Sequence, residues 1–118
     1  MLKILEINFQ AFLFQVGWKA NIRGVDLNLQ FPAGWTNARD IKYAQGFDKP
    51  AHRDFVGFGP LTEPESLAVY NFTLSHNFEL VIAYHTQGQE IYWNFQNINP
   101  PRGFQIANAF SEVSRLFG

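Results

Sequence analysis

The sequence contains no cysteine, and this absence removes several classes of site at once. Disulfide scaffolds, thiolate zinc clusters and thiol nucleophiles all need that residue. Charged residues are also scarce at 16% of the chain, and 9 basic against 10 acidic residues give a formal net charge of −1. Because no run of either sign occurs, nucleic acid and anionic membrane are not expected as partners.

No segment is apolar for long enough to cross a bilayer. The first 16 residues are largely apolar, but polar side chains interrupt them and Lys3 supplies the one basic end. This pattern does not fit a signal peptide, which carries a basic start and an uninterrupted apolar core. We therefore expect this chain to be cytoplasmic.

Aromatic residues are abundant, with 13 Phe, 3 Trp and 4 Tyr among 118 residues, and 47% of the chain is hydrophobic. Such a composition is typical of a chain that packs a core, not of a disordered tail. The length suits one small domain but is short for a complete α/β enzyme.

The first half of the chain shows three patterns. Residues 2–16 mix alternating and helical spacing, so strand and helix are equally supported. Residues 22–31 alternate apolar with polar side chains, which predicts a strand or an extended segment. Residues 32–60 carry Gly, Pro, Asn and Asp between aromatic residues, which predicts a long ordered loop. Its aromatic anchors are Trp35, Tyr43, Phe47, Phe55 and Phe58.

A helix is predicted after Thr62. Thr62 and Glu65 have the spacing of a capping box, and Pro64 suits the first helical turn. Apolar residues then continue to Leu74, and Asn77 is a plausible end.

The last third predicts a buried strand, a second strand and a helix. Residues 80–84 form a short apolar run without alternation, as in a strand covered on both faces of a parallel sheet. Residues 91–95 are a second strand candidate, and residues 105–116 have helical spacing. This order predicts an α/β fold, namely a partial mixed β-sheet with flanking helices.

His85 is the leading candidate for chemistry because it follows the carboxyl end of the predicted buried strand, where α/β sheets place ligands. The alternative is a histidine that holds the loop. His52 and His76 are interpreted as structural or solvated residues. No HExxH motif, phosphate-binding glycine loop or GxSxG elbow occurs, so the chain alone encodes no complete metal, nucleotide or serine-hydrolase site.

Three segments together resemble the zinc carboxypeptidase family of the carboxypeptidase A type. Residues 18–32 (WKANIRGVDLNLQFP) are similar to its W(K/R)xN…RGVDLNRNFP segment. Residues 58–65 (FGPLTEPE) resemble its YRGPxPFSEPE segment, and residues 81–89 (VIAYHTQGQ) resemble the strand that ends in HSYGQ. The resemblance covers about residues 18–114, so we expect residues 1–118 to form one partial carboxypeptidase-like domain.

The resemblance implies roles for single residues. His85 matches the third zinc ligand, Asn28 a substrate-carboxylate contact, and Lys19 the arginine that stabilises the oxyanion. Leu29 stands where the family has an arginine that pairs with a C-terminal carboxylate, and Gln30 completes the implied substrate-binding group. Because that charge is missing, the sequence is most similar to bacterial γ-D-glutamyl-diamino acid endopeptidases, which cut peptidoglycan peptides. We expect Lys19, Asn28 and His85 to face one cleft, within about 10 to 12 Å of one another.

Other family residues have no match. The HxxE zinc ligands lie upstream of Trp18 in the family, and the catalytic glutamate and closing tyrosine lie beyond Ser114. We therefore expect an inactive fragment of a zinc metallopeptidase, whose partners are a peptidoglycan stem peptide and a complementary fragment of the same enzyme. The alternative is a catalytically inactive module that binds peptide or glycan. The full-length relatives are expected to be exported to the cell wall.

Overall fold

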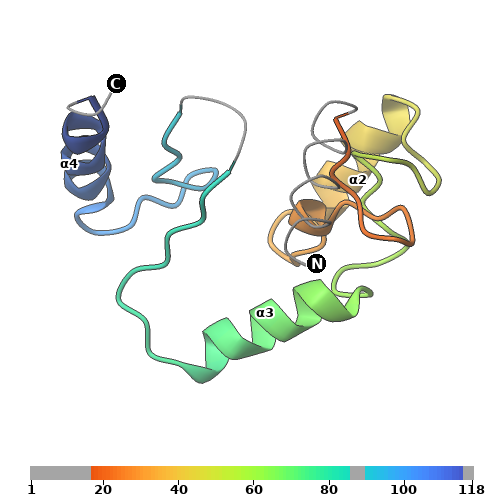
Figure 1. Cartoon of the computed structure of the whole chain (residues 1–118), viewed down its shortest axis with the longest axis horizontal. Helices are drawn as coiled ribbons and strands as arrows, with labels where there is room; N and C mark the ends of the chain where they lie inside the picture. The colour runs from red at the N-terminus through yellow and green to blue at the C-terminus, as the bar shows by residue number, and fades with distance from the viewer. Residues whose placement is uncertain (1–16, 86–89, 116–118) are drawn as a thin grey trace, which may run out of the picture. The chain divides into compact units, whose positions relative to one another are not determined.

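A computed structural model of the protein describes residues 17–85 and 90–115. Two compact units, Met1–Glu79 and Leu80–Gly118, divide the chain and are described separately (Figure 1). The elements, in order, are the 3-10 helix η1 (Leu27–Leu29) and the α-helices α2 (Trp35–Ala44), α3 (Pro64–Ser75) and α4 (Gly103–Arg115). The prediction for residues 2–16 lies outside the described residues.

The predicted α/β fold with a partial mixed β-sheet is wrong for the residues that the structure describes. These residues form helices and loops, and their β-pairing is limited to two isolated bridges, Ala20 with Asp26 and Phe95 with Ile98.

Side-chain hydrogen bonds explain why residues 22–31 do not form the predicted strand. The Asn21 side-chain oxygen accepts bonds from the backbone N–H groups of Arg23 and Val25, at 3.0 and 3.1 Å, and folds a turn. Asp26 then caps η1 by accepting a bond from the Asn28 N–H at 3.3 Å. Such local bonds compete with a strand ladder for the same backbone groups.

The apolar run at residues 80–84 is neither a strand nor buried. Leu80 is 51% exposed, Val81 62% and Tyr84 87%. Residues 91–95, the second predicted strand, also form no ladder. A central strand of a parallel sheet needs neighbouring strands at its edges and helices over its faces, and the described residues supply no neighbouring strand.

Both predicted helices of the second half are present as α3 and α4. The predicted cap of α3 is wrong, because the N-cap is Glu63 and no side chain caps it. Thr62 lies one residue earlier, and its hydroxyl contacts Gln30 and Gly59 instead, at 3.1 and 3.3 Å. Pro64 occupies the first helical position, so the helix starts one residue later than the capping-box spacing indicates.

Helix α2 corrects the prediction of a loop over residues 32–60. The buried Trp35 starts this helix and donates its indole N–H to the Val56 carbonyl at 3.2 Å. Tyr43 stacks on Phe55 with ring centroids 6.5 Å apart. Contacts with a segment more than ten residues away thus stabilise a helix that local composition does not favour.

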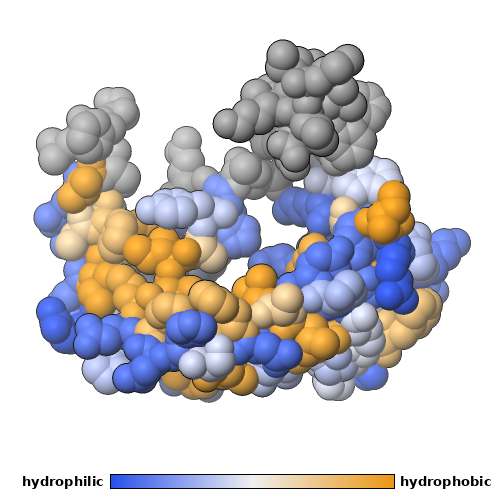
Figure 2. Space-filling view, turned by 60° about the horizontal axis from the view of Figure 1, so that its bottom comes forward, coloured by the Kyte–Doolittle hydropathy of each residue, from blue (hydrophilic) through white to orange (hydrophobic). Residues whose placement is uncertain are grey.

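Few hydrophobic side chains are buried among the described residues of the first unit, 17–79. They are Val25, Trp35, Phe55 and Val56. Many large apolar side chains remain exposed on α3 and in the second unit, including Phe72 at 58% and Leu74 at 67%. Figure 2 shows hydrophobic residues exposed among polar ones on the face that it displays. No helix among the described residues is both long and apolar enough to cross a membrane.

A buried glutamine holds the loop between Phe55 and α3. Gln30 is fully buried, and its amide nitrogen donates to the carbonyls of Val56 and Gly59. Its oxygen accepts from the Thr62 and Glu63 N–H groups, at 2.8 and 3.2 Å, and contacts the Thr62 hydroxyl. Gly57 has φ +83°, and a Cβ atom there would collide with the Gln30 nitrogen. This close approach requires glycine at position 57.

Asp54, which directly precedes Phe55, forms an ion pair with Lys42 of α2. Its carboxylate lies 2.7 Å from the Lys42 ammonium and 2.8 Å from the Arg53 guanidinium. Partial burial raises the pKa of Asp54, but the hydrogen bonds and charges of Lys42 and Arg53 outweigh burial and hold the pKa below its ordinary value.

We expect Gln30→Met to lower the free energy of unfolding by about 2 to 4 kcal/mol, because buried backbone groups lose their partners while the side-chain volume is kept. Urea denaturation measures the change. Thr62→Val is the control, since it removes only the hydroxyl contact and should cost about 1 kcal/mol or less. Equal losses for the two variants would contradict the central role of Gln30.

We expect Asp54→Asn to lower the free energy of unfolding by about 1 kcal/mol at pH 7. Asparagine tolerates the positive φ of 66° at this position, so the change removes the charge and one acceptor oxygen without adding backbone strain. A folded-state pKa below the unfolded value of 3.8 contributes stability above that value, and the contribution is lost as pH falls through the folded pKa. The difference from wild type should therefore vanish in acid. Asp48→Asn, at an exposed aspartate, should show little effect at any pH.

Candidate functional site

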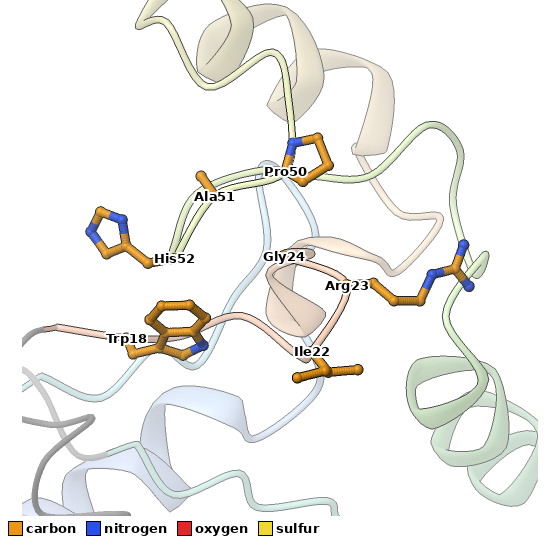
Figure 3. Close-up of a pocket in the computed structure, with 7 residues that line it drawn as sticks. All are labelled: Trp18, Ile22, Arg23, Gly24, Pro50, Ala51 and His52. Atoms are coloured by element: carbon orange, nitrogen blue, oxygen red, sulfur yellow. The ribbon is translucent and has the colours of Figure 1, made fainter.

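An open hollow of about 260 Å³ lies beside Lys19, and we call it the Trp18 hollow. In Figure 3, Trp18 and Gly24 lie next to the segment at residues 50–52, while the Arg23 side chain points away from that segment. Its lining residues are Trp18, Ile22, Arg23, Gly24, Pro50, Ala51 and His52.

The two segments of the Trp18 hollow are held together by backbone hydrogen bonds. The His52 carbonyl accepts from the N–H groups of Lys19 and Ala20, at 2.8 and 3.1 Å. Gly24 has φ +75°, and a Cβ atom at this position would lie 2.9 Å from the Pro50 Cβ. Only glycine allows this approach, so the backbone around Lys19 is closely defined.

A buried carboxylate ties the segment that carries Lys19 to the start of α3. Glu63 is 1% exposed, and the Asn21 side-chain amide donates to it at 2.6 Å. The Arg23 guanidinium lies 3.7 Å from the same oxygen. A buried carboxylate needs such partners, and their presence fixes the turn at residues 21–25 against the helix.

Lys19 itself is exposed, so its ammonium is accessible to a ligand. Asp26 is 4% exposed, and burial raises the pKa of its carboxyl, although hydrogen bonds from Asp54 and Asn28 and the Lys19 charge oppose the rise.

Asn28 and Leu29 both lie on η1. Asn28 is exposed, and Asp26 holds its backbone, so its amide is available to a ligand. Leu29 is half-buried and brings no charge to this site. The substrate-binding roles of Asn28 and Leu29 remain predictions.

Gln30, the third predicted substrate-binding residue, is fully buried, and its amide is engaged with the 56–63 loop. Both hydrogens and the oxygen of this amide have partners. We therefore expect any effect of Gln30 on substrate to act through the loop that it holds.

His85 lies in the second unit and is exposed, and its imidazole has no hydrogen-bond partner among the described residues. A free, neutral imidazole is a suitable zinc donor. Within the described residues no three His, Asp or Glu side chains gather into one cluster. Because Lys19 and Asn28 belong to the other unit, the predicted convergence of the three residues remains a prediction.

The other two histidines lie at exposed positions. The His52 ring centroid lies 6.1 Å from the Trp18 ring at the edge of the hollow. His76 is the C-cap residue of α3, and its ring nitrogen lies 2.8 Å from the Phe72 carbonyl.

Sequence reasoning missed the contact of Asn21 with Glu63. Pro64 is the signal that could have identified Glu63, because proline favours the first helical position and marks the residue before it as the N-cap. Nothing local indicates that the Glu63 side chain is buried, because its partner lies 42 residues earlier.

Residues 13–115 match the family model described as zinc carboxypeptidase. The chain is 49% identical over 112 residues to gamma-D-glutamyl-L-diamino acid endopeptidase 1 of Lysinibacillus sphaericus, over 95% of this chain and 27% of that protein. It is 43% identical over 97 residues to the uncharacterized protein YqgT of Bacillus subtilis (strain 168), over 82% of this chain and 25% of that protein. No solved structure matches.

The chain thus spans about a quarter of the length of these curated relatives. The family match nevertheless covers most of this chain and includes all three segments that carry the resemblance. The predicted resemblance is therefore confirmed, and the chain belongs to the zinc carboxypeptidase family.

Proposed function

We propose that this chain is part of a zinc metallopeptidase that hydrolyses γ-D-glutamyl-diamino acid bonds of peptidoglycan peptides. The observation that carries the proposal is the 49% identity to a gamma-D-glutamyl-L-diamino acid endopeptidase over nearly the whole chain. The exposed positions of Lys19, Asn28 and His85 support it, because residues with these roles must reach a substrate or a metal.

His85 would provide one zinc ligand through its neutral imidazole. Bound zinc supplies a Lewis acid that polarises a carbonyl and lowers the pKa of a bound water. One imidazole holds zinc weakly, so we propose that a complementary polypeptide of the same family provides the other ligands and the catalytic glutamate.

Lys19 would stabilise negative charge that develops on the carbonyl oxygen of the scissile bond. Its ammonium keeps the charge of an arginine but not the planar fork, so it acts as a point charge. The hydrogen bond from its backbone N–H to the His52 carbonyl holds the backbone from which this flexible side chain extends.

Asn28 would position the substrate with its exposed amide. Leu29 at the adjacent position cannot form a bidentate ion pair with a free C-terminal carboxylate. This difference favours cleavage inside a peptide or at an unusual linkage over removal of an ordinary C-terminal residue.

We expect the isolated chain to bind zinc weakly. Calorimetric titration with zinc chloride at neutral pH should detect no stoichiometric submicromolar site, because one imidazole supplies a single ligand. When the chain is co-produced with the flanking parts of the Lysinibacillus relative, zinc binding and γ-D-glutamyl hydrolysis should appear and should depend on His85.

In the enzyme completed with those flanking parts, His85→Ala should abolish zinc binding and γ-D-glutamyl hydrolysis. His76→Ala, at another exposed histidine, should abolish neither. A tight site in the isolated chain that is lost in His85→Ala would refute the fragment proposal. Zinc binding by the completed protein without hydrolysis would favour the inactive binding module.

We expect Lys19→Met to lower kcat of the completed enzyme about 10²- to 10³-fold with little change in KM, because the ammonium acts chiefly on the transition state. Lys19→Arg keeps the charge and should retain most activity. Equal loss in both variants would contradict the oxyanion role.

A further inference from the structure

A second hollow, of about 240 Å³, lies between η1 and the first turns of α3, and we call it the Glu65 hollow. Leu27, Phe31 and Val69 give it apolar walls, while the Asn28, Glu65 and Ser66 side chains provide the polar groups. Its wall thus combines an aliphatic and aromatic surface with one carboxylate.

The two sides of the Glu65 hollow are joined by a hydrogen bond. Ser66 is 3% exposed, and its hydroxyl donates to the Leu27 carbonyl at 3.2 Å. Asp26 caps η1 and so fixes the backbone of Asn28 on the opposite wall. Both walls are therefore fixed in place without a ligand.

Two of the three polar side chains of this hollow, Glu65 and Asn28, are available for binding. Glu65 is exposed and has no ion pair within 4.0 Å in the described part of the chain. Asn28 is exposed as well, and among those residues its side-chain amide has no hydrogen-bond partner. None of the lining residues is cationic, so Glu65 sets the charge of the hollow.

We infer that the Glu65 hollow binds an aliphatic chain that ends in an ammonium group. The apolar walls contact the methylene groups, the Glu65 carboxylate pairs with the ammonium, and the Asn28 amide accepts one of its hydrogens. The inference rests on the proposed function, since a diamino acid carries such a chain, and it assigns Glu65 as the residue that recognises the side-chain amine.

The expected effects are small but measurable. An exposed ion pair changes affinity about two- to five-fold, so the charge preference should have this size. Glu65 also lies in the first turn of α3, where a negative charge stabilises the helix. The test must therefore measure ligand binding and not stability.

Nuclear magnetic resonance on this chain can test the inference with two probes. N-acetyl-lysine amide and N-acetyl-norleucine amide share an aliphatic chain, but only the first carries an ammonium. We expect lysine amide to shift the Asn28 side-chain amide and the Val69 methyl signals, with about two- to five-fold tighter binding than norleucine amide.

Glu65→Gln should remove this preference, so that both probes bind alike. Glu79→Gln, at another exposed glutamate outside the hollow, should leave the preference unchanged. Equal binding of the two probes to wild type would overturn the inference, as would shifts that avoid Asn28 and Val69 or a preference that persists in Glu65→Gln.

Failure of this inference and failure of the proposed function are distinguishable. The probes measure the Glu65 hollow in the chain itself, whereas hydrolysis is measured in the completed enzyme. A completed enzyme that cleaves γ-D-glutamyl-lysine and γ-D-glutamyl-norleucine peptides equally well would overturn the assignment of Glu65 and keep the peptidase function. If the chain binds lysine amide more tightly than norleucine amide but the completed enzyme hydrolyses neither peptide, the assignment of Glu65 stands and the peptidase function fails.

Discussion

The larger unit depends on the buried side-chain amide of Gln30. Its nitrogen and oxygen bind backbone groups at both ends of the segment from Val56 to Glu63. A buried backbone group that loses its partner costs about 1 to 3 kcal/mol, so each of these bonds restricts the conformations open to the loop. Because few hydrophobic side chains are buried among residues 17–79, these polar contacts contribute much of the geometry of that part of the chain.

The position of the candidate site follows from that constraint. Gln30 fixes the chain up to Glu63, and Glu63 in turn binds the side chain of Asn21. Asn21 folds the turn that follows Lys19, while Asp26 caps the short helix that presents Asn28. Among the described residues, a buried polar network therefore holds the backbone that carries the exposed Lys19 and Asn28.

In the proposed function, Leu29 and Glu65 bear on how the substrate differs from that of an ordinary carboxypeptidase. Leu29 stands where the family resemblance implies an arginine. The side chain that would pair with a C-terminal carboxylate is therefore missing at this position. Glu65, which matches the last glutamate of the family's YRGPxPFSEPE segment, supplies the one carboxylate of a mostly apolar hollow that Asn28 also lines. In the proposed function, this carboxylate and the missing cation at position 29 would both favour an amine over a carboxylate.

Some properties of this protein were determined by sequence alone. The order of the three segments within residues 18–89 was sufficient to identify the family, and the spacing of apolar residues predicted α3 and α4, because a helical face repeats locally. The predicted sheet was wrong in the described residues, because β-pairing needs partners that a local pattern cannot supply.

Other features were decided only by the tertiary structure. Helix α2 depends on Trp35 and Tyr43 meeting the segment at residues 55–56, and the Thr62 hydroxyl contacts Gln30 instead of capping α3. In each case the decisive partner is distant in sequence. Its contribution appears only when the fold brings the two groups together, so the burial of Gln30 and Glu63 could not be inferred from their neighbours along the chain.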